Sequence, residues 1–326
     1  MSPKISIVIP TYNRSSYLKQ TIGSALAQNY ESFEIIISDN ASQDDTAHVV
    51  EGFISDSRVK YFRNDTNIGM VGNWRKCIYE HASGDWFLIL SDDDYFIDPT
   101  YLSKAAALIE RDSEVVLVYA NGYIRYEPEG NQIPLDLPFQ GIVDGVKVFL
   151  SRGEIKPQDL MLCNVIFNRD ESLRLEPFTN PYNVSCDSEL FLKLCLRGNV
   201  GVINDYVTVY RMHGDNLILK VLEDFDLLIN NWEYLISPYL YAHVNSSIDE
   251  RNLHLFREKK IIPALEYLLL NAMVDHKDRY NEVTSYVKKK GHSFYEDLYR
   301  IGNYKFLIKL FIGKYFPFFY KYMKRS

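Results

Sequence analysis

The chain has 326 residues, of which 47% are hydrophobic and 24% are charged, and its formal net charge is −7 at pH 7. This much apolar surface excludes a disordered chain, and the acidic balance argues against a general nucleic-acid binder, because phosphate contacts need a basic surface. The length allows two domains, or one large domain with an appendage. Charge is unevenly placed, since residues 305–326 carry six basic residues and no acidic ones.

Short apolar runs alternate with helix-like stretches over the first 120 residues. Strands are predicted over residues 5–9, 33–37, 59–62, 86–90 and 115–119. Helices are predicted between them, over residues 17–26, 42–53, 71–81 and 99–109, and Ser42 with Asp45 resembles a capping box at the start of the second helix. This alternation predicts an α/β fold whose sheet is mostly parallel, Rossmann-like and covered by helices on both faces.

The pattern is less regular over residues 121–184, where we expect strands and loops that build an acceptor side. A helix over residues 186–197 and strands over 200–203 and 206–210 follow, and the chain is mainly helical from about residue 217. We therefore predict one domain over residues 1–216 and a mainly helical region over residues 217–326.

Cysteine usage and targeting patterns indicate the compartment. Cys77, Cys163, Cys186 and Cys195 form no C-x-x-C pair, so we predict buried, reduced thiols rather than a zinc or redox site. No signal-peptide pattern precedes the first strand, and no run of ~18 apolar residues predicts a transmembrane helix. We therefore expect a cytoplasmic protein.

Polar residues directly follow the predicted strands. They are Pro10 to Asn13, Asp39 and Asn40, Asn64 to Gly69, and Ser91 to Asp94. In a parallel sheet, ligands bind beyond the carboxyl ends of the strands, so these residues are candidates for a single binding site.

Each of these motifs allows a structural and a functional interpretation. The run Asp92–Asp94 is either a solvated acidic turn or a site where a divalent cation is shared with phosphate oxygens. Asp39 and Asn40 fit either a turn with a helix cap or contacts to a base or ribose. Asn67 precedes a helix whose first N–H groups suit either a cap or an anion.

Three other motifs are missing from the sequence. No G-x-G-x-x-G follows the first strand, and neither G-x-x-x-x-G-K-[ST] nor G-x-S-x-G occurs. Their absence disfavours a Rossmann dinucleotide site, a P-loop NTPase and an α/β-hydrolase.

In combination, the motifs that are present resemble the family 2 glycosyltransferases, which are inverting enzymes with the GT-A fold. The resemblance covers roughly residues 3–215. It depends on five motifs in order: Pro10-Thr11-Tyr12-Asn13, Asp39-Asn40-Ala41-Ser42-Gln43-Asp44, Asn67-Ile68-Gly69, Gly84-Asp85-Trp86 and Ser91-Asp92-Asp93-Asp94.

The resemblance implies a nucleotide pocket in which Asp39 accepts a hydrogen bond from the base or ribose. The other residues it implies for nucleotide binding are Pro10, Thr11, Tyr12, Asn13, Asn67, Asp92 and Asp93. It also implies a DxD-type pair, Asp92 and Asp94, that binds Mn²⁺ or Mg²⁺, with Asp94 as the direct ligand. The family's acidic cluster often starts one residue earlier, where this chain has Ser91, so all three aspartates stay candidates for the metal.

Two later motifs complete the implied site. Ser185–Leu190 resembles the family's acidic helix start, which implies that Asp187 is the catalytic base and Glu189 its alternative, although Cys186 stands where the family usually has Glu. Tyr210-Arg211-Met212-His213 resembles an Arg-x-His motif near the donor diphosphate. It implies that His213 contacts the metal or the diphosphate, and that Arg211 pairs with phosphate or with a core carboxylate.

The resemblance implies a metal-dependent, inverting glycosyltransferase that moves a sugar from a nucleotide-diphosphate donor to an acceptor hydroxyl. The acceptor would be a glycan or a lipid-linked saccharide, in bacterial polysaccharide or lipopolysaccharide assembly such as O-antigen or capsule. Two alternatives remain open: a sugar-nucleotide nucleotidyltransferase and a non-catalytic sugar-binding protein. No motif identifies the donor nucleotide, the sugar, the linkage or the oligomeric state.

Residues 304–326 combine aromatic and basic side chains. Phe306, Leu307, Leu310 and Phe311 approximate helical spacing before Pro317. The segment is either a helix packed on the protein's own core or an interfacial amphipathic helix drawn to the anionic inner-membrane surface. The second interpretation predicts peripheral attachment to the cytoplasmic membrane.

Overall fold

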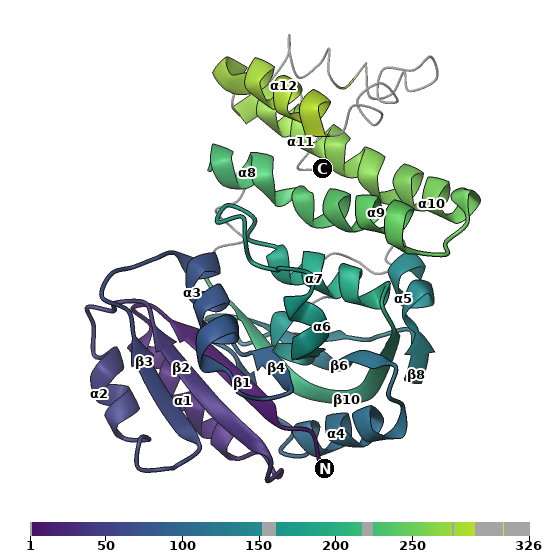
Figure 1. Ribbon diagram of the computed structural model, residues 1–326. Helices are drawn as coiled ribbons and strands as arrows, with labels where there is room; N and C mark the ends of the chain where they lie inside the picture. Colours follow the sequence, from purple (N-terminus) through teal and green to yellow (C-terminus); the bar gives the residue numbers. More distant parts are fainter. Residues whose placement is uncertain (1, 152–160, 217–223, 276, 291–308, 310–326) are drawn as a thin grey trace. The chain divides into compact units, whose positions relative to one another are not determined.

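The computed structural model describes residues 2–151, 161–216, 224–275, 277–290 and 309 (Figure 1). The chain divides into two compact units, Met1–Pro181 with Cys186–Gly214 and Tyr182–Ser185 with Asp215–Ser326. The predicted division of roles between residues 1–216 and 217–326 stays a prediction.

The first unit is built on one sheet with the strand order β3-β2-β1-β4-β9-β6-β10-β5. Its strands are β1 Ile5–Thr11, β2 Phe33–Asp39, β3 Val59–Arg63, β4 Trp86–Ile89, β5 Tyr95–Phe96, β6 Val115–Tyr126, β7 Gln132–Leu135, β8 Gly141–Asp144, β9 Val165–Asn168 and β10 Asn199–Met212. Strands β1 to β4 run parallel, as do β6 and β10, while β5, β7, β8 and β9 pair antiparallel with their neighbours. The predicted α/β fold with a mainly parallel sheet is confirmed.

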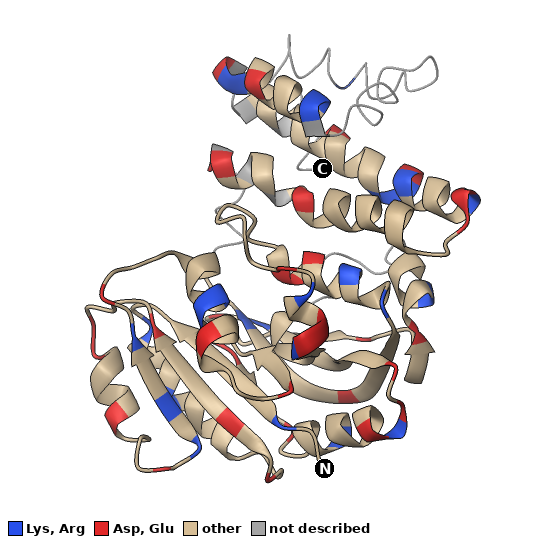
Figure 2. Cartoon of the chain, in the orientation of Figure 1, with Lys and Arg blue, Asp and Glu red and all other residues tan. Residues whose placement is uncertain are grey.

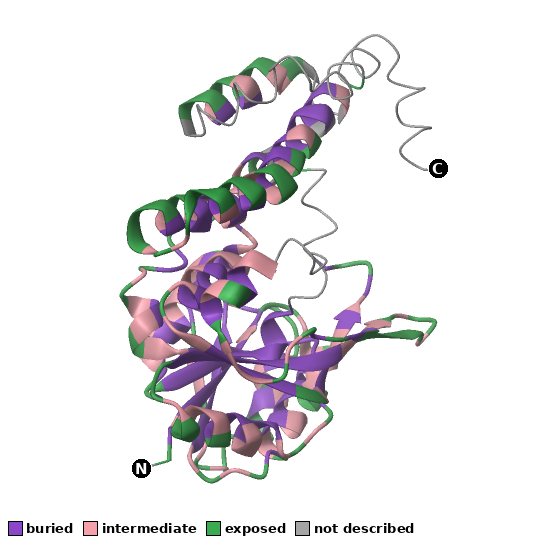
Figure 3. Cartoon of the chain, turned by 90° about the vertical axis from the view of Figure 1, so that its right-hand side faces the viewer, coloured by how far each residue is buried: buried purple, intermediate pink, exposed green. Residues whose placement is uncertain are grey.

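Helices cover both faces of this sheet, with α3, α6 and α7 on one side and α1 and α4 on the other (Figure 1). The helices of the first unit are α1 Ser15–Leu26, α2 Thr46–Glu51, α3 Met70–Lys76, α4 Tyr101–Arg111, α5 Gly145–Ser151, α6 Arg169–Leu173 and α7 Cys186–Cys195, and a π-helical turn, Cys77–His81, extends α3. Acidic and basic residues are interspersed over these elements (Figure 2). The strands between the two layers are buried along most of their length, because both faces are covered (Figure 3).

Some predicted elements have different bounds. The strand predicted over residues 115–119 continues to Tyr126 in β6. The strands predicted over 200–203 and 206–210 are one strand, β10. At the break between the two predicted strands, the pairing of β10 with β6 shifts its register. Residues 121–184 contain the helices α5 and α6 as well as strands and loops.

One buried carboxylate ties the first strands of the sheet together. Glu34 of β2 is 3% exposed and accepts hydrogen bonds from Ser6 Oγ, Ser83 N and Lys60 Nζ, each at 2.7 Å. Burial alone would raise the pKa of Glu34, but these hydrogen bonds outweigh it and lower the pKa to about 2. All four cysteines of the chain are buried and free, as predicted.

The second unit is helical in its described part. Its helices are α8 Phe225–Asn231, α9 Glu233–Asn245, α10 Glu250–Phe256, α11 Ile262–Asp275 and α12 Tyr280–Lys290, with a π-helical turn, Arg257–Ile261, between α10 and α11. This confirms the predicted helical C-terminal region. None of the helices in the described ranges combines the length and apolar character that a membrane crossing needs. The basic, aromatic segment 304–326 lies outside the described residues, apart from Lys309.

Candidate functional site

The loops after β1 and β2 are fastened to each other at the carboxyl edge of the sheet. Asn13 N donates to Ser42 Oγ at 3.0 Å, and Gln43 N donates to Asn13 Oδ1 at 2.7 Å. Asn13 and Ala41 both have positive φ, at 54° and 66°, which is a costly conformation for alanine. Ser42 therefore binds a neighbouring loop, and helix α2 begins only at Thr46, so the predicted capping box at Ser42 is wrong.

Asp39, at the end of β2, is fully buried and already hydrogen-bonded. Its Oδ1 accepts from Ser42 N at 2.7 Å, and its Oδ2 accepts from Tyr61 Oη at 2.7 Å and from Arg63 Nη1 at 3.0 Å. Burial and the bond to Asp39 raise the pKa of Tyr61 to about 12, so this phenol stays a donor. The carboxylate is thus held in one orientation at the predicted nucleotide edge.

A network of asparagines braces the next loop. Asn40 Nδ2 donates to Asn67 Oδ1 at 2.8 Å, while Asn64 Nδ2 donates to both Asn40 Oδ1 at 3.1 Å and Asn73 Oδ1 at 3.0 Å. Asn67 Oδ1 also accepts from Gly69 N, and Gly69 has a φ of 78° that favours glycine. Asn67, predicted to bind the nucleotide, therefore holds loops together, and the sequence had not assigned Asn64 and Asn73 to this network.

The three aspartates that follow β4 have different partners. Asp92 Oδ2 accepts a hydrogen bond from the backbone N–H of Tyr12 at 3.3 Å. Tyr12 itself is 43% exposed. Burial, with the negative charge of Asp93 nearby, raises the pKa of Asp92 to about 7. The Thr11 hydroxyl lies beside this carboxylate, but the two do not reach hydrogen-bond geometry.

Asp94 is enclosed in the protein. It is 1% exposed, and its Oδ1 accepts the backbone N–H of Arg211 at 2.9 Å. Burial, then repulsion from Asp93, raises the pKa of Asp94 well above its ordinary range. The assignment of Asp94 as the direct metal ligand remains a prediction, and this geometry does not favour it.

Asp93 instead faces the end of β10. Its Oδ2 lies 2.9 Å from His213 Nε2 and accepts from Arg14 Nη1 at 2.5 Å. Arg14 Nη1 is also 3.0 Å from His213 Nε2. The His213 ring stacks on Tyr17, with 5.3 Å between ring centroids and 15° between planes. The structure thus brings Asp93 and His213 together, and it adds Arg14, whose only sequence signal was its position directly after Pro10-Thr11-Tyr12-Asn13.

Arg211 is packed into the protein rather than open to a ligand. Its guanidinium lies over the rings of Tyr17 and Tyr95, at 5.0 Å and 4.6 Å from their centroids. Nη1 donates to the carbonyl oxygen of Asp93 at 2.6 Å, and Nη2 donates to Gln20 Oε1. Of its two predicted roles, these contacts suit the structural one.

The first turn of α7 holds Asp187, which is half-buried. Glu189, its predicted alternative as base, forms an ion pair with Lys193 at 2.6 Å one turn along the helix. The assignment of Asp187 as the catalytic base, with Glu189 as its alternative, stays a prediction.

The pKa of Tyr210 is affected both by the acidic turn after β4 and by Asp187 of α7. Burial raises the pKa of its phenol, and the negative charges of Asp94, Asp93 and Asp187 raise it further. The Tyr210 phenol is thus within electrostatic range of Asp187 and of the acidic turn after β4.

These residues offer a partial site for a divalent cation. In the described part of the chain, no group of three or more His, Cys, Asp or Glu side chains is placed to hold a metal. Asp93 and His213 supply one oxygen and one nitrogen, and Mn²⁺ or Mg²⁺ in nucleotide enzymes takes few protein ligands and completes its shell with phosphates and water. The donor set therefore fits a cation that binds together with a diphosphate.

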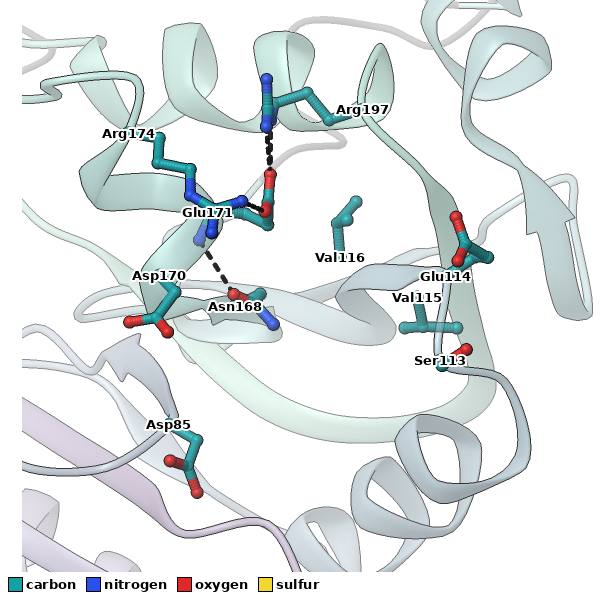
Figure 4. Close-up of a pocket in the computed structure, with 10 residues that line it drawn as sticks. All are labelled: Asp85, Ser113, Glu114, Val115, Val116, Asn168, Asp170, Glu171, Arg174 and Arg197. Atoms are coloured by element: carbon teal, nitrogen blue, oxygen red, sulfur yellow. Dashed lines mark hydrogen bonds and ion pairs between the residues drawn. The ribbon is translucent and has the colours of Figure 1, made fainter.

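A cavity of about 410 Å³ lies elsewhere in the first unit (Figure 4). Asp85, which precedes β4, and Val115, which begins β6, line it, so it opens at the amino ends of these strands. Arg174 and Arg197 both pair there with Glu171. The cavity includes none of the predicted site residues.

Comparisons with known proteins bear on the family and the fold of the chain. The model for "Glycosyl transferase family 2" matches residues 6–170. Poly(ribitol-phosphate) beta-N-acetylglucosaminyltransferase TarS of Staphylococcus aureus is 31% identical over 121 residues, which are 36% of this chain and 21% of TarS. The alignment thus spans about a fifth of that relative. UDP-Glc:alpha-D-GlcNAc-diphosphoundecaprenol beta-1,3-glucosyltransferase WfaP of Escherichia coli is 28% identical over 243 residues, which are 73% of this chain and 88% of WfaP.

Solved structures show the same fold at low sequence identity. TarS residues 1–349 in complex with UDP-GlcNAc superpose with a TM-score of 0.64 at 16% identity, covering 91% of this chain and 93% of the other. The mannosyltransferase PcManGT of Pyrobaculum calidifontis, in complex with GDP-Man and Mn²⁺, gives a TM-score of 0.53 at 14% identity, covering 97% and 88%.

Proposed function

The chain belongs to glycosyl transferase family 2, and from this premise we propose that it is a metal-dependent, inverting glycosyltransferase. It transfers a sugar from a nucleoside-diphosphate donor to an acceptor hydroxyl. The observation that carries the proposal is the pairing of Asp93 Oδ2 with His213 Nε2 at 2.9 Å, directly beside the loops of the predicted nucleotide pocket.

Asp93 and His213 hold the cation in this proposal, with Asp92 beside them. Bound there, Mn²⁺ or Mg²⁺ supplies a Lewis acid that neutralises the charge developing on the diphosphate leaving group. Pro10, Thr11, Tyr12 and Asn13 form one wall of the nucleotide pocket, with Tyr12 exposed for contact with the base. Asp39, held by Tyr61 and Arg63, accepts a hydrogen bond from the base or ribose.

Asp187 is the catalytic base. An acceptor hydroxyl is a weak nucleophile at neutral pH, so Asp187 removes its proton while the new bond to the sugar forms and the bond to the diphosphate breaks. Displacement by the acceptor itself needs no second, nucleophilic carboxylate, and it inverts the configuration of the sugar carbon.

The acceptor is a glycan or a lipid-linked saccharide of a bacterial surface polysaccharide. WfaP supports the lipid-linked class, because its name gives α-D-GlcNAc-diphosphoundecaprenol as its acceptor. A lipid-linked acceptor would place the enzyme at the cytoplasmic face of the membrane, where the basic segment 304–326 can bind anionic lipid. The donor nucleotide stays open, since the neighbours bind both UDP- and GDP-sugars.

Incubation with labelled UDP- and GDP-sugars, with Mn²⁺ or with EDTA, tests the proposal. Transfer to a lipid-linked saccharide, or slow Mn²⁺-dependent hydrolysis of one donor, supports a glycosyltransferase. Pyrophosphate release from a sugar phosphate and a nucleoside triphosphate would indicate a nucleotidyltransferase instead. Binding of sugar without either reaction would indicate a non-catalytic protein.

A further inference from the structure

The guanidinium of Arg14 lies against the two side chains proposed to hold the metal, Asp93 and His213. Arg14 Nη1 lies 2.5 Å from Asp93 Oδ2 and 3.0 Å from His213 Nε2, and these two atoms are 2.9 Å apart. One nitrogen of the Arg14 guanidinium thus lies beside both the carboxylate oxygen and the imidazole nitrogen. A divalent cation that used these two atoms would need the same position.

We propose that Arg14 is a built-in cation that occupies the Asp93–His213 pair when no donor is bound, and that it moves to the donor diphosphate when a divalent cation takes its place. The inference rests on the proposed function, and it adds an order to ligand binding. Metal alone binds weakly, and metal with diphosphate binds strongly.

The Arg14 backbone is anchored, and its side chain is more exposed than the two groups it contacts. Its carbonyl accepts the N–H groups of Tyr17 and Leu18 at 3.1 and 3.2 Å, and the next residue, Ser15, donates its N–H to Asp44 Oδ2 at 3.0 Å. The Arg14 side chain is 23% exposed, whereas those of Asp93 and His213 are 8% exposed. The neighbouring Arg211 is instead enclosed between two aromatic rings.

The electrostatics make the exchange cooperative. A guanidinium and a divalent cation repel each other strongly at distances of a few ångströms in a partly buried site. A diphosphate relieves this repulsion, because its oxygens accept hydrogen bonds from arginine and also bind the metal. Each ligand therefore favours the binding of the other, and the coupling passes through Arg14.

The test compares wild type, Arg14→Gln and Lys19→Gln. Lys19 is an exposed residue of α1, the helix that begins directly after Arg14, so its variant removes one nearby positive charge without touching the pair. Mn²⁺ binding without nucleotide is measured by electron paramagnetic resonance, and pyrophosphate binding at saturating Mn²⁺ is measured by calorimetry. We expect Arg14→Gln to bind Mn²⁺ at least ~10-fold more tightly and pyrophosphate at least ~10-fold more weakly. Lys19→Gln should match wild type in both.

Further measurements separate this inference from the proposed function. Adding Asp93→Asn to Arg14→Gln should abolish the gained Mn²⁺ affinity, which assigns the gain to this pair of groups. Unchanged or weaker Mn²⁺ binding by folded Arg14→Gln, while wild-type transfer stays Mn²⁺-dependent, would overturn the role of Arg14 and leave the proposed function standing. Wild-type protein that neither binds Mn²⁺ with pyrophosphate nor transfers sugar would overturn both.

Discussion

His213 Nε2 lies 2.9 Å from Asp93 Oδ2, although 120 positions separate the two residues in the chain. Asp93 follows β4, and His213 follows β10, which enters the sheet several strands away. The backbone N–H of Arg211 donates to Asp94 Oδ1 at 2.9 Å and so anchors the end of β10 to the acidic turn. This anchor positions His213 next to Asp93.

Asp93→Asn is expected to remove the metal site. The variant replaces the anionic oxygen shared by His213 and Arg14 with an uncharged amide, which is a poor ligand for Mn²⁺. We expect Mn²⁺-dependent transfer to fall at least ~100-fold, since even substitutions around a metal's ligands cost 10–100-fold. Transfer activity measured over a titration of Mn²⁺ in the presence of the donor gives the size of this loss. Full activity at ordinary Mn²⁺ concentrations would contradict the assignment of Asp93 as a metal ligand.

Asp94→Ala is expected to destabilise the fold. It leaves the buried N–H of Arg211 without its acceptor, which costs about 1–3 kcal/mol of unfolding free energy. Urea unfolding of Asp94→Ala against Asp93→Asn separates the two roles. Loss of Mn²⁺ affinity in Asp94→Ala at undiminished stability would instead support the sequence-based assignment of Asp94 as the ligand.

The sequence predicted the fold, and it placed the candidate site residues at one edge of the sheet, because both inferences depend on local patterns. Strand and helix periodicity placed Asp39 and Asp92 at the carboxyl ends of buried strands, and the structure has Asp39 as the last residue of β2 and Asp92 in the turn after β4. It could not distinguish the roles of adjacent aspartates, since Asp93 and Asp94 differ only in which distant group each one meets. That depends on where the end of β10 lies relative to the acidic turn after β4, which no local pattern records.

Arg14 and Arg211 show the same limit for basic residues. Sequence resemblance left two roles for Arg211, pairing with phosphate or with a core carboxylate, and the structure encloses its side chain between Tyr17 and Tyr95. Arg14 had no predicted role, yet it reaches Asp93 and His213. Charge alone does not say whether an arginine is packed in the protein or open to a ligand, because that depends on rings and carbonyls supplied by other strands.

Asp187→Asn is expected to keep donor binding and lose catalysis. The amide cannot take up the proton of the acceptor hydroxyl, so transfer should fall by ~10²–10⁴-fold while the affinity for the donor changes little. Glu189→Gln is the matched control. It breaks an ion pair with Lys193 that is worth about 0.3–0.5 kcal/mol, and transfer should survive. The reverse pattern of activities would move the role of base to Glu189.

The segment 304–326 is expected to bind anionic membranes. Full-length protein and a chain ending at residue 302 are mixed with vesicles containing phosphatidylglycerol and separated by flotation. Full-length protein should float with the vesicles at low salt and be released at high salt, because screening weakens the attraction of basic residues to lipid. Equal recovery of both proteins in the soluble fraction would support a helix packed on the protein's own core.

Gly84→Ala is expected to destabilise the protein by about 1–3 kcal/mol. A Cβ at this position would lie 2.7 Å from the carbonyl oxygen of Lys4 and 2.8 Å from the amide nitrogen of Ser6, and backbone atoms of paired strands cannot move aside cheaply. Gly23→Ala on α1 is the control, because nothing lies within 4 Å of its added methyl group. It should leave stability unchanged or raise it by up to ~1 kcal/mol, and thermal unfolding compares the two.

Glu34 is expected to make stability depend on acidic pH. Its pKa in the folded protein is about 2, below its ordinary value of 4.5, so its contribution is fully present above pH 5. As the pH falls from 4.5 toward 2, the unfolded chain binds a proton that the folded protein excludes, and up to roughly 3 kcal/mol is lost.

Glu34→Gln removes this titrating group and leaves Lys60 without its buried partner. The variant should be less stable than wild type at pH 6, and the difference should shrink as the pH approaches 3, because wild type then loses the contribution that the variant lacks. Urea unfolding of both proteins between pH 3 and pH 6 measures the difference. A constant gap across this range would show that Glu34 stabilises the sheet by packing, with no contribution from its charge.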